Sequence, residues 1–164
     1  MARRAFYSFH YVPDNWRASQ IRNMGVVEGN RPASDNDWET IKKGGDKAIQ
    51  KWIDDQMHGK SVVIVLVGSK TAGRKWIKYE IKKAWKSSKG LLGVHVHNLK
   101  NKDGDQATKG TNPFEGIIID GNNLSKIIKT YDPPYSTSNY VYSHINDNLA
   151  DWIEKAIEIR GKYD

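Results

Sequence analysis

The chain contains no cysteine in its 164 residues. Disulfide bonds and thiol chemistry are therefore excluded, and we expect a cytoplasmic protein, because disulfides mark oxidising compartments. The chain also lacks a run of about 18 apolar residues, the length that a membrane-spanning helix requires. Its first residues, Met1-Ala2-Arg3-Arg4, lead straight into a strand-like segment without the apolar stretch of a signal peptide, so we expect no membrane partner.

Acidic residues are outnumbered by basic ones, 19 against 26, which gives a net charge of +7. This balance favours anionic partners such as nucleotides, nucleic acid or an acidic protein surface, without choosing among them. Charged residues at 27% and hydrophobic residues at 38% are typical of a globular chain rather than a disordered one. At this length we expect one domain over residues 1–164 with one core.

The hydrophobic pattern predicts strands that alternate with helices. Residues 61–67 form a continuous apolar, largely β-branched run, which is typical of a strand covered on both faces of a parallel sheet. A helix over 74–89 and a strand over 91–99 follow it. The other expected elements are a strand at 5–11, a short helix capped by Asp14 or Asn15, a short strand at 25–27, a helix at 36–58 weakened by Gly44-Gly45, a final core strand at 117–119 and a helix at about 143–160. We predict a flavodoxin-like three-layer α/β sandwich with a mostly parallel five-stranded sheet.

Glu80 is the only acid in the helix predicted at 74–89, and it lies near the N-terminal end of that helix. Trp76 precedes it by one turn. Ligands of open α/β sheets bind at the carboxyl edge of the strands, which is where this end of the helix is expected. The residues alone leave two interpretations open. Glu80 either forms an ion pair with Lys83 and complements the helix dipole, or it is a functional acid.

The outer face of the same helix is rich in lysine. A run of this kind is usually a solvated face, and no base-reading motif or interleaved aromatic residue accompanies it. We therefore do not expect nucleic acid as a partner, although a nucleic-acid sensor stays an alternative. His95 and His97 alternate along a predicted strand, but no third ligand is evident, so we expect no metal site.

Three ordered segments resemble the TIR-like proteins of the bacterial Thoeris anti-phage system. They are FYSFHY (6–11) with DNWR (14–17), VGS (67–69) with WIKYE (76–80), and GVHV (93–96) with KGTNPF (109–114). The resemblance covers about the first 120 residues and implies a TIR-like fold, with the helix at 143–160 as a C-terminal extension. The loop at 28–37 matches the usual TIR loop poorly.

The resemblance also implies an activity. TIR-like enzymes of this kind are NAD glycohydrolases or ADP-ribosyl cyclases: they cleave the nicotinamide–ribose bond of NAD and make a cyclic ADP-ribose-type signal that activates a separate effector. A phage-derived protein is an expected trigger, and NAD is a substrate, so no cofactor is implied. Glu80 takes the place of the catalytic glutamate. A carboxylate suits this reaction, because positive charge develops on the ribose as in glycoside cleavage.

Candidate substrate-binding residues lie around the same sheet edge. Phe9, His10 and Tyr11 end the first predicted strand, on the edge that also carries Ser69, and aromatic rings there are suited to stack on nicotinamide or adenine. The alternative for Phe9 is packing in the core, and for His10 a histidine that is merely satisfied by its hydrogen bonds. Trp76 is expected either as a wall of the pocket or as a packing residue.

Three further candidates each have an ordinary structural alternative. Arg17 is expected to bind a diphosphate or to be a surface cation. Trp38 is expected as a lid residue or as part of the core. Asn112 matches a family position, but Asn-Pro also favours a turn. For the whole chain, a non-catalytic TIR-like interaction or sensor module is the alternative function, with a homo-oligomer as an open partner, because a fold does not determine an activity.

Overall fold

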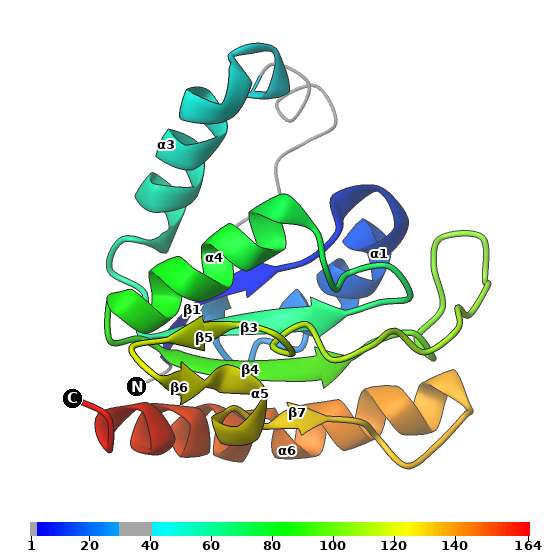
Figure 1. Ribbon diagram of the computed structural model, residues 1–164. Helices are drawn as coiled ribbons and strands as arrows, with labels where there is room; N and C mark the ends of the chain where they lie inside the picture. Colours follow the sequence, from blue (N-terminus) through cyan, green and yellow to red (C-terminus); the bar gives the residue numbers. More distant parts are fainter. Residues whose placement is uncertain (1–2, 30–40) are drawn as a thin grey trace.

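A computed structural model of the protein describes residues 3–29 and 41–164. Five parallel strands form its main sheet in the order β2-β1-β3-β4-β7 (Figure 1). These strands are β1 (Arg4–Ser8), β2 (Glu28–Gly29), β3 (Val62–Val67), β4 (Gly90–His95) and β7 (Thr130–Tyr131). The predicted flavodoxin-like α/β fold with a five-stranded sheet is confirmed.

Strands β3 and β4 form the centre of the molecule, and every residue of both is buried. Their register pairs Val62 with Gly90 and Val67 with His95. Burial on both faces explains why β3 reads as an uninterrupted apolar run instead of an alternating one. Since all the strands are parallel, their carboxyl ends meet at one edge of the sheet, where open α/β folds bind ligands.

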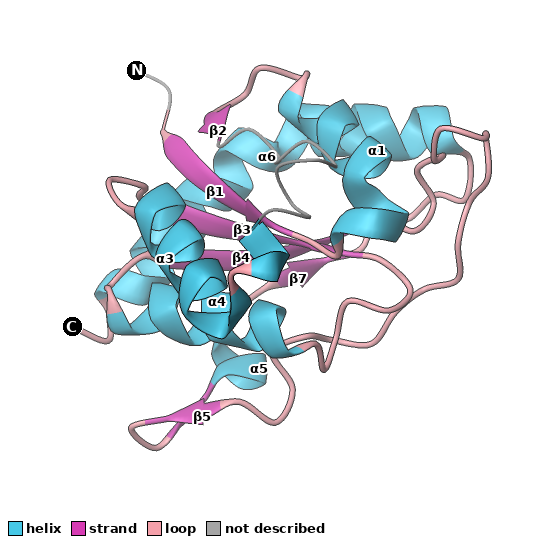
Figure 2. Cartoon of the chain, turned by 90° about the horizontal axis from the view of Figure 1, so that it is seen from above, coloured by secondary structure: helices cyan, strands magenta, loops and turns pink. Residues whose placement is uncertain are grey.

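Helices cover both faces of this sheet and make the three layers. On one face lie α1 (Tyr11–Arg22) and α6 (Ser138–Gly161); on the other lie α3 (Gly45–Met57) and α4 (Lys75–Lys86), which Figure 2 shows in front of the strands. The pleat of β1 illustrates the division. Phe6 packs among residues of α3 and α4, whereas Tyr7 packs on the side of α1 and α6.

The two glycines inside the predicted helix at 36–58 do interrupt it. Helix α3 begins at Gly45, whose φ of +79° is a left-handed conformation that favours glycine. Its apolar residues, Ile49, Ile53 and Met57, face the sheet. Trp38 and most of the predicted loop at 28–37 lie outside the described residues.

The first helix starts earlier than its capping residues predicted. Its N-cap is His10, so the prediction that Asp14 or Asn15 caps it is wrong. Asp14 sits inside the first turn, where its backbone N–H donates to the carbonyl oxygen of His10. Pro13 also lies in this turn, and proline is tolerated there because the early N–H groups of a helix have no intrahelical partner. As a result β1 ends at Ser8 rather than at residue 11.

Two strand predictions need correction. The short second strand lies at Glu28–Gly29, after the predicted 25–27. Residues 117–119 do not add a strand to the main sheet. They supply β5 (Ile118–Ile119), which forms a separate antiparallel pair with β6 (Asn122–Asn123), followed by the short helix α5 (Leu124–Ile127). The fifth strand of the main sheet is β7, in a stretch whose pattern indicated no element.

Helix α6, expected as an extension, is one of the layers. Val141, Ile145, Leu149 and Ile153 are buried from it against the sheet. In the described part of the chain, no helix combines the length and apolar character needed to span a bilayer.

Candidate active site

A cavity of about 670 Å³ opens at the carboxyl end of β1, between α3 and α4. We call it the Glu80 cleft. Its volume is in the range of small-molecule and cofactor sites. The strand order changes direction between β1 and β3, and this switch point is where flavodoxin-like sheets bind their ligands. Among the described residues, its lining includes Phe6, Tyr7, Phe9, His10, Tyr11, Val12, Lys42, Ile49, Trp52, Ile53, Lys70, Ala72, Gly73, Arg74, Lys75, Trp76, Ile77 and Glu80.

Glu80 is the only acid among the described residues of this lining, and its side chain is 7% exposed. It lies in the second turn of α4, on the side that faces β1. The hydroxyl of Ser8, the last residue of β1, donates a hydrogen bond of 2.8 Å to Oε1 of Glu80. The alternative in which Glu80 pairs with Lys83 is wrong, because the Lys83 ammonium lies 3.6 Å from Asp54 instead.

Burial determines the protonation of Glu80. Removing a carboxylate from water disfavours its charged form, and this raises the pKa of Glu80 to about 8, while the Ser8 hydrogen bond acts in the opposite direction. A glutamic acid with a pKa this far above its ordinary value is typical of catalytic sites. At neutral pH Glu80 is therefore protonated in most molecules.

Asp54 links the two helices that flank the cleft, because it lies on α3 and bonds to two residues of α4. The hydroxyl of Tyr79 donates to its Oδ1 at 2.8 Å, and Lys83 forms the longer ion pair with the same oxygen. Burial and this hydrogen bond raise the pKa of Tyr79 to about 12, so the phenol stays a donor at physiological pH. The rings of Trp76 and Tyr79 pack edge to face, with their centroids 5.6 Å apart. Trp76 itself lines the cleft, so this contact connects Tyr79 to the cleft wall.

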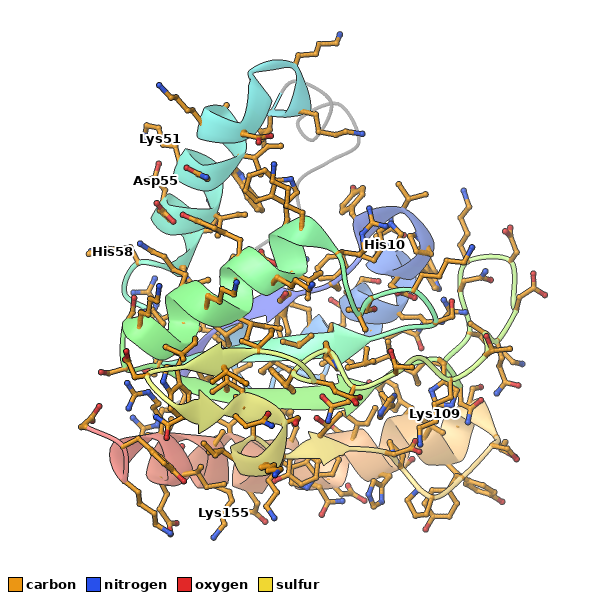
Figure 3. The ribbon with its side chains drawn as sticks, in the orientation of Figure 1. His10, Lys51, Asp55, His58, Lys109 and Lys155 are labelled. Carbon is orange, nitrogen blue, oxygen red and sulfur yellow. The ribbon has the colours of Figure 1, made fainter. Side chains whose placement is uncertain are left out.

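The predicted aromatic residues at the end of the first strand do converge on the cleft. Phe9, His10 and Tyr11 all line it, with the rings of Phe9 and Tyr11 stacked at 6.2 Å. Figure 3 shows His10 beside the N-terminal turn of α1. Its Nδ1 is buried with no hydrogen-bond partner among the described residues. Burial, followed by the charges of Arg74 and Lys70, lowers the pKa of His10, so its ring is neutral at physiological pH.

Arg17 lies outside the cleft lining. Its side chain is 3% exposed, so the alternative of a surface cation is wrong. The guanidinium donates to the Asp14 carboxylate at 2.8 Å and to the carbonyl oxygens of Pro13, Leu99 and Asp105. These bonds tie α1 to the loop after β4, which is a structural role in place of the predicted contact with a diphosphate.

Two other predicted residues also lie outside the lining. Oδ1 of Asn112 accepts a hydrogen bond of 2.9 Å from the backbone N–H of Phe114, the pattern of an Asx turn, so its structural alternative is the one observed. Ser69 follows β3 in a turn and is half-buried. His95 and His97 are buried edge to face at 5.7 Å, and no cluster of three metal-ligating side chains occurs in the described residues.

Sequence reasoning missed Ser8, the partner of Glu80 beside the cleft, and several residues of the cleft lining. The position of Ser8 could have been predicted from the alternation of side chains in a strand. Ser8 lies on the same face as Phe6, and this is the face on which α4 packs. Lys70 and Arg74 belong to the loop between β3 and α4, whose position was predicted without a role for its cations. Trp52 faces the cleft from α3, which helical periodicity assigned only to packing.

The sequence itself matches a known protein family. The sequence model of the family described as "Thoeris protein ThsB, TIR-like domain" matches residues 6–101, more than half of the chain. The chain belongs to this ThsB TIR-like family. The predicted resemblance is thereby confirmed.

A curated relative supports the same assignment. It is a protein of Bacillus cereus (strain MSX-D12) named "Putative cyclic ADP-D-ribose synthase ThsB1", and it is 37% identical to this chain over 137 residues. The aligned region covers 80% of this chain and 71% of the relative. All the described residues that line the Glu80 cleft fall within the region matched by the ThsB family model.

Proposed function

We propose that this ThsB-family protein cleaves the nicotinamide–ribose bond of NAD and closes the remaining ADP-ribose into a cyclic signal. One observation carries the proposal: Glu80 is a buried carboxyl with a raised pKa, held by Ser8, inside a cleft of sufficient volume for a nucleotide. The name of the Bacillus relative, a cyclic ADP-D-ribose synthase, supports the choice of substrate and product.

The chemistry of the first step suits a single carboxylate. When the bond between the nicotinamide nitrogen and the anomeric carbon breaks, its electron pair leaves with nicotinamide, which becomes neutral and needs no acid. The ribose is left as an oxocarbenium-like cation. The carboxylate form of Glu80 stabilises that charge in a buried site, where electrostatic interactions are strong. The positive nicotinamide ring of NAD, once bound nearby, lowers the pKa of Glu80 and favours this form.

The second step depends on which nucleophile reaches the anomeric carbon. Attack by an atom of the same ADP-ribose closes a ring, and its proton passes to the Glu80 carboxylate or to water; attack by water gives linear ADP-ribose. The apolar lining supports ring closure because it limits water at the reacting carbon. This lining includes Phe6, Ile49, Trp52, Ile53 and Trp76.

The cellular role follows from the cyclic product. A diffusible nucleotide couples this protein to a separate effector of the Thoeris anti-phage system, with a phage-derived protein as the trigger. The protein then acts in the cytoplasm as a signal-producing enzyme, with NAD as its substrate and no bound cofactor.

The test follows nicotinamide release and nucleotide products from NAD by chromatography and mass spectrometry, with and without phage lysate. We expect nicotinamide and a product lighter than ADP-ribose by one water. Glu80→Gln should reduce release by about two orders of magnitude or more, because it removes the negative charge that meets the cation. Glu115→Gln, at an exposed glutamate outside the cleft lining, is the matched control and should behave as wild type.

Two results would contradict the proposal in different ways. Equal release by the wild-type and Glu80→Gln proteins would reject the role of Glu80. No release by the wild-type protein, either alone or with lysate, would reject the activity itself.

A further inference from the structure

The lysine and arginine residues of the described cleft lining are Lys42, Lys70, Arg74 and Lys75, and two of these four belong to the loop between β3 and α4. Lys70 and Arg74 both line the cleft, and both are exposed, whereas Glu80 is buried. The charged groups thus lie toward the opening and the reactive acid toward the interior. Neither cation forms an ion pair with an acid in the described part of the chain. Lys75, next to Arg74, differs because it pairs with Asp46 of α3.

The two cations also lie close enough to His10 to act on its ring. The nearby positive charges of Arg74 and Lys70 act on this ring from the loop, in addition to its burial. Their positions therefore place positive potential inside the cleft, close to the end of β1. Among the described lining residues only Glu80 is able to offset it, and that carboxyl is mostly protonated at neutral pH.

Two helix N-termini strengthen the same field. His10 is the N-cap of α1 and Arg74 is the N-cap of α4, and the first turns of both helices contribute residues to the lining. Neither N-cap side chain bonds to its own helix. The first turn of α4 has no acid, whereas that of α1 contains Asp14, whose carboxylate is paired with Arg17. Free backbone N–H groups and the positive ends of the helix dipoles favour an anion at such a position.

We propose that Lys70 and Arg74 form an anion-binding rim that holds the diphosphate of a dinucleotide at the mouth of the Glu80 cleft. This inference rests on the proposed function, because it identifies how the substrate of that site is oriented. A bound diphosphate at the rim leaves the nicotinamide ribose to extend inward, toward Glu80 and Ser8. Guanidinium and ammonium groups are the usual protein partners of phosphate oxygens.

The experiment measures ligand binding in a Glu80→Gln background, so that NAD is not consumed. Quenching of tryptophan fluorescence is a suitable signal, since Trp52 and Trp76 line the cleft. The double variant Lys70→Ala, Arg74→Ala should bind NAD and ADP-ribose roughly ten- to a hundredfold more weakly, as expected for the loss of charge-assisted hydrogen bonds. Its affinity for nicotinamide riboside, which has no phosphate, should stay the same.

The control removes the same net charge from helix α4, which follows the rim residues in the chain. Lys78→Ala, Lys82→Ala changes two exposed residues of α4 that do not line the cleft. It should leave NAD affinity within about twofold of the parent, since screened surface charges contribute little at physiological salt. Equal weakening in both double variants would show a general charge effect and would overturn the rim, as would unchanged NAD affinity in Lys70→Ala, Arg74→Ala.

Turnover separates this inference from the proposed function. With Glu80 present, the rim variant should show a raised KM with kcat changed little, because the diphosphate is bound equally in the ground and transition states. A wild-type protein that binds ADP-ribose through the rim but releases no nicotinamide keeps the rim and rejects the catalysis. A protein that cleaves NAD with an unchanged KM after loss of both cations keeps the catalysis and rejects the rim.

Discussion

The hydrogen bond between Ser8 and Glu80 is buried, and it joins strand β1 to helix α4, which are far apart in sequence. The hydroxyl donates to Glu80, and this single bond does not compensate for the loss of water around the carboxylate. The folded protein therefore holds Glu80 mainly in its neutral form at pH 7. A buried carboxyl of this kind reduces the stability of the fold at neutral pH, because the unfolded chain ionises more readily.

This linkage predicts how stability depends on pH. Below the unfolded pKa of about 4.5 the carboxyl is protonated in both states; between 4.5 and about 8 only the unfolded state loses the proton, so the free energy of unfolding falls as pH rises. Glu80→Gln lacks this titration. Its stability relative to wild type should rise by about 3 kcal/mol between pH 4 and pH 7. Urea unfolding of both proteins at each pH measures the difference, and a pH-independent difference would show an ordinary pKa for Glu80.

Single residues were predictable to different degrees. The position of Glu80 at the carboxyl edge of the sheet was predictable, because this residue is the only acid in a lysine-rich helix and lies near the N-terminal end of that helix. Its burial was not, since a helical position on the border between two faces is compatible with either environment. Arg17 shows the opposite difficulty. Its pairing with Asp14 three residues earlier fits helical spacing, but its bonds to the carbonyl oxygens of Leu99 and Asp105 depend on a loop that lies nearby only in the fold.

At the scale of elements, three segments of the chain are in close contact at the carboxyl edge of the sheet. The Asp14 carboxyl of α1 packs on Gly68 at the end of β3, and the carbonyl oxygen of Gly68 packs on Gly110 of the loop after β4. A Cβ atom on Gly110 would lie 2.1 Å from that oxygen. Only a residue without a side chain allows the loop to approach β3 so closely, and the loop in turn covers one end of the core.

Gly110→Ala should therefore destabilise the protein by about 1–3 kcal/mol, because the obstacle is backbone and must move. The control is Gly161→Ala at the end of α6, where nothing lies within 4 Å of the added methyl group and the effect should stay within about 0.5 kcal/mol. Thermal and urea unfolding compare the two. A Gly110→Ala protein as stable as the Gly161→Ala protein would mean that the loop adjusts freely.

The elements themselves were predictable where local and tertiary signals agree. The buried run of β3 and the glycine break before α3 belong to this group. The element at residues 117–119 was not predictable in this way, because three isoleucines in a row fit a core strand of the main sheet as well as they fit the separate hairpin. The decisive signal was the Asp120-Gly121 pair that follows, with both residues at positive φ, which is the preferred sequence of a two-residue hairpin turn. Strand β7 has only two residues and is defined by pairing with β4, which periodicity does not reveal.

At the scale of the whole molecule, the site depends on a core that continues beyond the family match. The ThsB family model ends at residue 101, and the cleft lies entirely before that point. Yet β3 and β4, which position the loop to α4, are buried on their other face by α6. Tyr131 of β7 also stacks on Trp152 of α6, with ring centroids 4.3 Å apart. Residues after 121 therefore complete the scaffold of the site while contributing no side chain to its described lining.

This arrangement predicts that α6 and the cleft unfold together. Leu149→Ala empties a fully buried position of α6 against the sheet and should lower the free energy of unfolding by about 2–5 kcal/mol, in a single transition seen alike by tryptophan fluorescence and far-ultraviolet circular dichroism. Asn146→Ala, at an exposed position of the same helix, should change it by less than about 0.5 kcal/mol. If α6 were a separate extension, Leu149→Ala in a Trp152→Phe background would instead give an early circular-dichroism transition of the helix alone. The fluorescence of the remaining tryptophans, which include Trp76 of the cleft, would then keep its original midpoint. Coincident loss of both signals would show that the sheet transmits the packing of α6 to the wall that carries Glu80.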